Sequence, residues 1–182
     1  KPDAGVTDTK QQGDALATAE SRATIDATDR IVAPGFIDIH THYDAQILWD
    51  PDLTPSCWHG VTSVVVGNCG FGIAPTRPEH RETIARTLEN VEGMAFDALV
   101  EGIDWTFETF PEYLAAIEGM AKRLNVGVLA GHTPTRLYVL GEEASDREAT
   151  EAEVAEMAAI IKGALEAGAV GFTHLFNAMT PL

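Results

Sequence analysis

The sequence has few basic side chains, only two cysteines and no long apolar run. Its 12 lysines and arginines stand against 28 aspartates and glutamates, so the formal net charge is −16. Such a charge repels phosphate backbones and anionic lipid surfaces, which argues against nucleic-acid binding. No apolar stretch is long enough to cross a membrane, and residues 1–15 lack the apolar core of a signal peptide. We therefore expect a soluble, cytoplasmic protein.

The two cysteines, Cys57 and Cys69, are too few for a disulfide framework. Free thiols are typical of a reducing compartment, where a thiolate is available as a metal ligand. Cys57 lies beside Trp58 in a loop and is interpreted as a small buried hydrophobe. Cys69 is flanked by glycines, which let the backbone approach a bound ion. Most free cysteines are apolar fillers, so the residues alone leave its ligand role open.

From residue 31 onward, short apolar runs alternate with helical patterns. The runs predict strands at 36–42, 61–68, 126–132 and 168–176. This alternation is typical of parallel strands joined by right-handed crossovers. It predicts an α/β fold in which residues 31–182 form a parallel (β/α) barrel of TIM type, with only about the first half, four βα units, present. Residues 1–30 are polar and are interpreted as the remnant of a small β element.

Three helices are predicted between these strands. Residues 78–91 place Ile84, Leu88 and Val91 on one face, and residues 111–124 are amphipathic. The third has the clearest start, because Thr150 and Glu153 form a capping box. Its apolar stripe comprises Val154, Met157, Ile160, Ile161 and Leu165. The 61–68 run is rich in β-branched residues and is predicted to be a fully buried parallel strand.

Polar residues follow the C-terminal ends of the predicted strands, where (β/α) barrels carry their sites. They are His40, His42, Cys69, His132 and His174. His40 and His42 are two apart, so on a strand their imidazoles point to the same side and can share a cation. Thiolate and imidazole ligands suit zinc.

Several of these and other polar residues have roles that the pattern alone leaves open or assigns to structure. Asp44 could orient an imidazole or cap the loop. His132 with Arg136 could contact a substrate carboxylate. His59 and His80 are expected in a loop and on a helix surface. A lone histidine such as His174 is more often structural than a ligand.

The segment "IVAPGFIDIHTHYDAQ" resembles the first strand of the amidohydrolase superfamily, whose hallmark is a His-x-His pair. The segments "GNCGFGIAP", "EGIDWTFETFPEYLAAIE" and "GVLAGHTPTRLYV" are similar to N-acyl-D-amino-acid deacylases, or D-aminoacylases. This resemblance implies a zinc-dependent hydrolase that cleaves the amide bond of N-acyl-D-amino acids to a carboxylate and a free D-amino acid. It also implies that His40, His42 and Cys69 are metal ligands.

The C-terminal "THLFNAMTPL" departs from the deacylases and is similar to a motif of N-acetylglucosamine-6-phosphate deacetylases. That likeness implies that His174 is a metal ligand and that Asn177 and Ala178 help to hold a sugar phosphate. Two alternative functions follow. One is a deacetylase-like hydrolase, and the other is a non-catalytic, metal-binding half-barrel fragment.

Half a barrel leaves two sheet edges open, so we expect pairing with another copy or completion by a missing C-terminal half. The aspartate that the family uses as general base has no counterpart among the four units. Asp44 and Asp38 are the nearest available carboxylates. The isolated chain is therefore expected to bind metal better than it turns over its small-molecule substrate.

Overall fold

The computed structural model describes residue 23 and residues 25–174, and its chain divides into two units, residues 1–34 and 35–182. In the described part of the first unit, Thr28 donates its backbone N–H and its hydroxyl to the Asp26 carboxylate at 2.9 and 2.6 Å, closing a turn. Most of the β remnant predicted in residues 1–30 lies outside the described residues. The paragraphs below concern the second unit.

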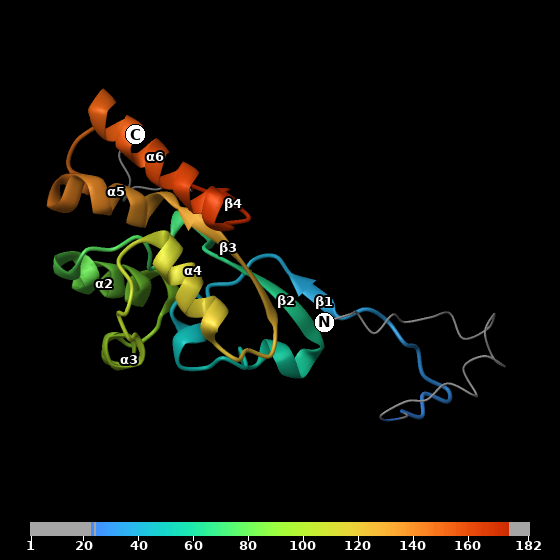
Figure 1. The fold of residues 1–182 in the computed structure, drawn as a ribbon. Helices are drawn as coiled ribbons and strands as arrows, with labels where there is room; N and C mark the ends of the chain where they lie inside the picture. Colours follow the sequence, from blue (N-terminus) through green and yellow to red (C-terminus); the bar gives the residue numbers. More distant parts are fainter. Residues whose placement is uncertain (1–22, 24, 175–182) are drawn as a thin grey trace. The chain divides into compact units, whose positions relative to one another are not determined.

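A four-stranded parallel sheet forms the centre of this unit (Figure 1). The strands are β1 (Phe36–Asp38), β2 (Val61–Val66), β3 (Asn125–Gly131) and β4 (Gly171–Thr173), in the order β1-β2-β3-β4. Ile37 pairs with Ser63, Val64 with Val126, and Ala130 with Phe172. The prediction of a parallel half-barrel is confirmed, although β1 and β4 are shorter than their apolar runs.

Helices and short 3₁₀ turns connect the strands. The α-helices are α2 (Arg81–Glu92), α3 (Phe96–Gly102), α4 (Phe110–Gly119), α5 (His132–Leu140) and α6 (Glu151–Ala167). The 3₁₀ turns are η1 (Gln46–Leu48), η2 (Ser56–His59), η3 (Asn68–Gly70), η4 (Pro78–His80) and η5 (Gly141–Ser145). Within the described residues, no helix is long and apolar enough to span a membrane.

Capping side chains define where two of these helices begin. The predicted box of Thr150 and Glu153 opens α6, and a second box, which the pattern did not predict, opens α4 at Thr109. The α4 helix ends at Gly119 and not at residue 124 as predicted. Lys122 lies just beyond this end and donates its ammonium to the Ile117 carbonyl at 2.9 Å, so it satisfies a carbonyl of the last turn.

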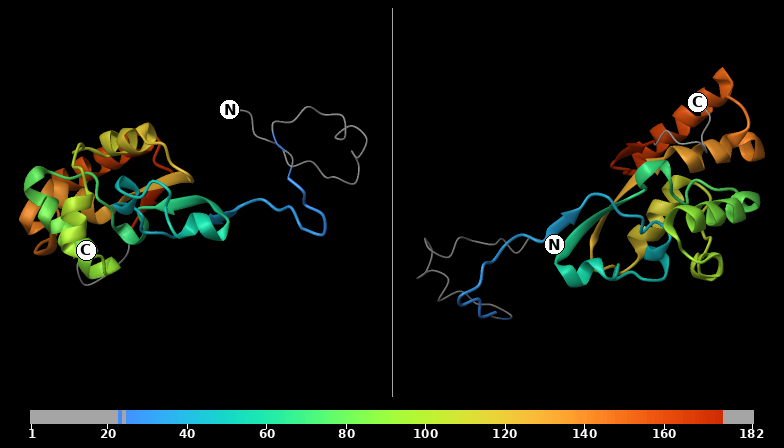
Figure 2. Two further views of the ribbon diagram at one scale, coloured as in Figure 1. Left: turned by 90° about the horizontal axis from the view of Figure 1, so that it is seen from below. Right: turned by 180° about the vertical axis from the view of Figure 1, so that it is seen from behind.

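The core lies on one face of the sheet. Val64 and Val66 of β2 and Val128 of β3 are buried beneath the helices, whereas the alternate residue Val65 is only half-buried. The prediction that β2 is fully buried is therefore wrong. The helices gather on one side of the strands (Figure 2), and the face that a closed barrel would turn inward has no layer packed on it among the described residues.

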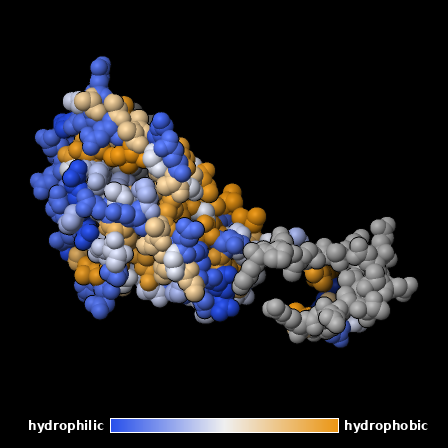
Figure 3. Space-filling model, viewed as in Figure 1, coloured by the Kyte–Doolittle hydropathy of each residue, from blue (hydrophilic) through white to orange (hydrophobic). Residues whose placement is uncertain are grey.

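Large apolar side chains remain exposed along both edges of the sheet. Phe36 of β1 is 69% exposed, and at the β4 edge Val170 and Phe172 are 62% and 47% exposed. Apolar residues gather over the strands in Figure 3. The predicted stripe of α6 also stays partly uncovered, since Val154 and Leu165 are 51% and 45% exposed. Within the described residues both edges are thus open, as expected for half a barrel.

Tyr113 connects α4 to the loop that follows β1, because its buried hydroxyl donates to the Asp44 carbonyl at 2.8 Å. Replacing Tyr113 by Phe leaves that buried carbonyl without its partner, and we expect the free energy of unfolding to fall by about 1–3 kcal/mol. Urea titration measures this change. The control is Tyr138→Phe, whose hydroxyl lies 3.5 Å from Glu108 and is more exposed. Equal losses in the two variants would contradict the prediction.

Candidate metal centre

The His-x-His pair lies in the loop just beyond β1. The Asp38 carboxylate, at the strand end, accepts the His40 backbone N–H at 3.1 Å. The ring centroids of His40 and His42 are 5.4 Å apart. His40 is exposed and His42 is half-buried. The pair therefore sits past the strand and not within it, but the two rings are still neighbours.

Cys69 lies in η3, the tight turn that follows β2. Its backbone φ of 57° is in the left-handed region, which non-glycine residues rarely adopt. Gly67, at the start of the turn, has a φ of 83°, and a Cβ there would collide with the Leu129 carbonyl of β3. This sharp reversal brings the Cys69 Sγ to 3.2 Å from Nε2 of His40.

Asn68 holds together the two loops that carry the candidate ligands. Its side-chain amide donates to the Thr41 carbonyl at 3.1 Å and to the Val65 carbonyl at 2.9 Å. Thr41 in turn donates its backbone N–H and its hydroxyl to the Val65 carbonyl, at 3.1 and 2.8 Å. Asn68 and Thr41 are both buried. The histidine loop is thus fastened to β2 immediately beside Cys69.

Three of the four predicted ligands come together in this arrangement. One donor atom each of His40, His42 and Cys69 lies within 4.8 Å of the others. Four-coordinate zinc, with bonds of about 2.0–2.3 Å, separates its ligand atoms by about 3.5 Å, so the spacing fits one ion. Two imidazoles and a thiolate are also a donor set that suits zinc.

Glu92, the last residue of α2, adjoins this group and was missed by sequence reasoning. Its Oε1 lies 3.2 Å from Nδ1 of His42. Burial raises the pKa of Glu92, and burial together with the nearby His40 lowers the pKa of His42. Both residues line a cavity of about 310 Å³ that also includes Asp38 and Met94. The available signal was spacing, because residue 92 continues the buried row of residues 84 and 88.

Asp44 supports the loop and does not face the cavity. It is 2% exposed, its carboxylate accepts the Gly67 backbone N–H, and it is not part of the cavity lining. Burial raises its pKa from 3.8 to about 7, with the nearby Glu92 adding to the rise. Of the two roles left open, the loop-capping one fits this placement. Asp38 is the predicted carboxylate that does line the cavity.

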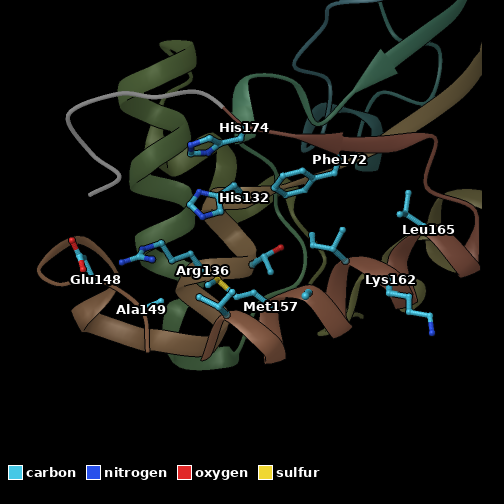
Figure 4. A pocket seen from close by; sticks show the side chains of 13 residues that line it. His132, Arg136, Glu148, Ala149, Met157, Lys162, Leu165, Phe172 and His174 are labelled. Carbon is cyan, nitrogen blue, oxygen red and sulfur yellow. The ribbon is translucent and has the colours of Figure 1, made fainter. Parts of the chain in front are cut away.

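His174 lies beside His132 and not in the His40–His42–Cys69 group. The two ring centroids are 4.3 Å apart, and both side chains line a second cavity of about 830 Å³ between α5, α6 and β4 (Figure 4). Burial, with help from His174 and Arg136, lowers the pKa of His132 to about 4. Four of the six histidines thus form two separate pairs, His40 with His42 and His132 with His174.

Of the remaining predicted residues, some have a structural role and others lie outside the part of the chain that the structure describes. Arg136 lines the second cavity, but its buried guanidinium donates to the Ala144 carbonyl at 2.6 Å and also to the Arg147 carbonyl, so it fastens a loop. Asn177 and Ala178 lie outside the described residues. His59, predicted in a loop, is exposed at the end of the 3₁₀ turn η2. His80 was predicted on a helix surface, but it is buried where η4 meets α2.

Comparison with known proteins agrees with the fold and with the resemblance of the sequence motifs. The amidohydrolase family model matches residues 23–181. The chain belongs to the amidohydrolase family. The resemblance to N-acyl-D-amino-acid deacylases is also confirmed, because N-acyl-D-aspartate deacylase of Alcaligenes xylosoxydans is 39% identical over 86% of this chain. An uncharacterized protein of Mycobacterium tuberculosis is 40% identical over 87%.

A solved relative matches most of this amidohydrolase chain with part of its own length. N-acyl-D-glutamate deacylase from Bordetella bronchiseptica, solved with zinc and a phosphonate inhibitor, superposes with a TM-score of 0.71 at 35% identity. The alignment covers 87% of this chain but 31% of that one. The chain likewise spans 29% of the Alcaligenes relative and 26% of the mycobacterial one. It therefore corresponds to less than a third of each relative.

The buried carboxyl of Asp44 should make the stability of this amidohydrolase chain depend on pH. Because its pKa is about 7 in the folded chain and 3.8 ordinarily, the folded state retains a proton that the unfolded chain loses between these values. The stability that this carboxyl contributes is thus present at low pH and is lost as the pH rises to 7. Over that range the free energy of unfolding falls by up to about 4 kcal/mol.

We expect Asp44→Asn, which stays neutral and keeps an acceptor for Gly67, to flatten this pH dependence and to be the more stable protein at about pH 8. Urea titrations of both metal-free proteins at about pH 5 and about pH 8 measure the difference. Parallel changes in the two proteins would show that the Asp44 carboxyl does not titrate in this way.

Proposed function

We propose that this chain supplies the zinc-binding part of a hydrolase that cleaves the amide bond of N-acyl-D-amino acids, releasing a carboxylate and a free D-amino acid. The observation that carries the proposal is the convergence of His40, His42 and Cys69 in a chain that aligns with deacylases over most of its length. The reduced thiol that this site needs favours the cytoplasm as its location.

His40, His42 and Cys69 would hold the ion. A bound zinc ion polarises a carbonyl and lowers the pKa of water to about 7. The protein's own contribution is placement: Gly67 permits the turn that aims Cys69 at His40, and Asn68 holds the two loops at a fixed separation. These groups are set before a substrate arrives, which is how a metal site avoids reorganisation during reaction.

The cavity beside the pair is where we place the scissile amide. It is lined by Asp38, His40, His42, Glu92 and neighbouring polar and apolar groups, and its volume is about 310 Å³. Asp38 is the carboxylate we assign to proton exchange there, because Asp44 is buried away from the cavity. Since the chain spans less than a third of its relatives, we expect it to bind zinc more readily than it releases amino acid.

Cys69→Ala tests the proposal most directly. We expect purified wild-type protein to retain about one zinc ion per chain. The variant should bind zinc at least about 10-fold more weakly, because one of the three candidate ligands is lost. Elemental analysis and competition with a chromogenic chelator measure both quantities. Cys57→Ala, which removes the other free thiol, is the matched control and should leave zinc binding unchanged.

Substrate assays distinguish the remaining possibilities. Release of amino acid from N-acyl-D-amino acids that Cys69→Ala abolishes would support the proposal, whereas selective hydrolysis of N-acetylglucosamine 6-phosphate would replace it. Zinc binding without either activity would identify a metal-binding fragment. Zinc content that is the same in wild type and Cys69→Ala would remove the proposed metal centre.

A further inference from the structure

Glu92 occupies a position that is costly for a carboxylate. It ends α2, where the partial negative charge of the helix C-terminus disfavours an acidic side chain, and no basic residue stands in that last turn. Its side chain is only 15% exposed. Leu88 and Ile84, four and eight residues earlier, are buried in the core, so the helix turns Glu92 inward on the same row. A carboxylate at this position is destabilising unless a hydrogen-bond donor or a positive charge lies next to it.

The partner that the structure provides is His42. Glu92 Oε1 and His42 Nδ1 are 3.2 Å apart, and the His42 side chain is itself only 19% exposed. The His42 Nδ1 atom is buried, and its present orientation does not align a hydrogen bond with any described residue. The Glu92 carboxylate is nevertheless within hydrogen-bond distance of this nitrogen. The nitrogen that then remains available to an ion is Nε2.

Charge supports the same assignment. Two neutral imidazoles and one thiolate bring a single negative charge to a divalent zinc ion. A carboxylate at Glu92, in contact with His42, brings the second, so the ion, its three ligands and this carboxylate carry no net charge. Asp38, the other carboxylate of the cavity lining, accepts the His40 backbone N–H instead. Neutral clusters are favoured where side chains are shielded from water, because an uncompensated buried charge is costly. Among the described residues, the cavity lining contains no lysine or arginine whose positive charge could compensate Glu92 in place of the ion.

We propose that Glu92 is a positioning residue for the metal centre: its carboxylate accepts the Nδ1–H of His42, selects that tautomer and orients Nε2 toward the ion. The inference rests on the proposed zinc site and adds a residue to it. Such carboxylate–histidine–metal arrangements typically affect metal affinity by about 10-fold to 100-fold. The role is one of orientation, since Glu92 acts on the ion through His42.

Two substitutions at Glu92 and one control test this. Glu92→Ala removes the acceptor, and we expect zinc to bind about 10-fold to 100-fold more weakly in chelator competition. Glu92→Gln keeps an acceptor oxygen without the charge and should recover part of that loss. Glu82→Gln makes the same charge change on the same helix, at a side chain that is 73% exposed and paired with Arg86, and should leave affinity unchanged.

Two further measurements separate orientation from folding. With cobalt in place of zinc, Glu92→Ala should keep the thiolate-to-metal absorption band of Cys69, which shows that the ion still occupies the same site. Urea titration of the metal-free proteins should give nearly equal stability for wild type and Glu92→Gln. A loss of affinity matched by an equal loss of metal-free stability would overturn the proposal, because the effect would then be structural.

The outcomes also distinguish the two proposals. Wild-type protein that binds neither zinc nor cobalt would remove the metal centre itself, and the role of Glu92 with it. Wild-type protein that binds zinc with an affinity that Glu92→Ala leaves unchanged would overturn the role of Glu92 alone. The metal centre of His40, His42 and Cys69 would stand in that case.

Discussion

The candidate centre depends on one carbonyl oxygen, that of Val65 near the end of β2. It accepts hydrogen bonds from the backbone and side chain of Thr41 and from the amide of Asn68. Thr41 lies between the two histidines, and Asn68 directly precedes Cys69. The three candidate ligands are therefore attached to a single point of the sheet. Because both donors are buried, water competes little for these bonds, which gives them more weight than exposed ones would have.

This local rigidity contrasts with the incompleteness of the surrounding layers. On one face of the sheet the side chains of Val64, Val66 and Val128 are buried. Within the described residues, apolar side chains at both sheet edges and in the stripe of α6 stay partly exposed. A TIM-type barrel buries the equivalent surfaces against its remaining units. The three candidate ligands need none of those units to meet, since they come from the ends of β1 and β2, which are neighbours in the sheet. The proposed metal binding would therefore need less of the barrel than the proposed turnover.

The parts of the fold that the sequence predicted are those set by local chemistry. Alternating apolar runs predicted four parallel strands, and Thr150 with Glu153 predicted the start of α6. The pairing of His40 with Cys69 followed from resemblance, because their 29-residue separation carries no periodic signal. Positions that depend on packing between elements were not predictable in this way. The buried Arg136 guanidinium donates to carbonyls of the loop after α5, and His80 is buried where η4 meets α2, so a one-dimensional pattern gives neither residue a distinctive mark.

Glu92 illustrates why the acidic character of this chain was hard to interpret. A net charge of −16 disfavours anionic partners in general, and a single glutamate among so many carries no information by itself. Its meaning comes from the helix that turns it inward, next to a histidine and near the buried Asp44. Packing acids together costs free energy unless a positive charge joins them. A cation held by His40, His42 and Cys69 would lie where it offsets that repulsion, so the same ion that serves the chemistry would also stabilise the loop that holds it.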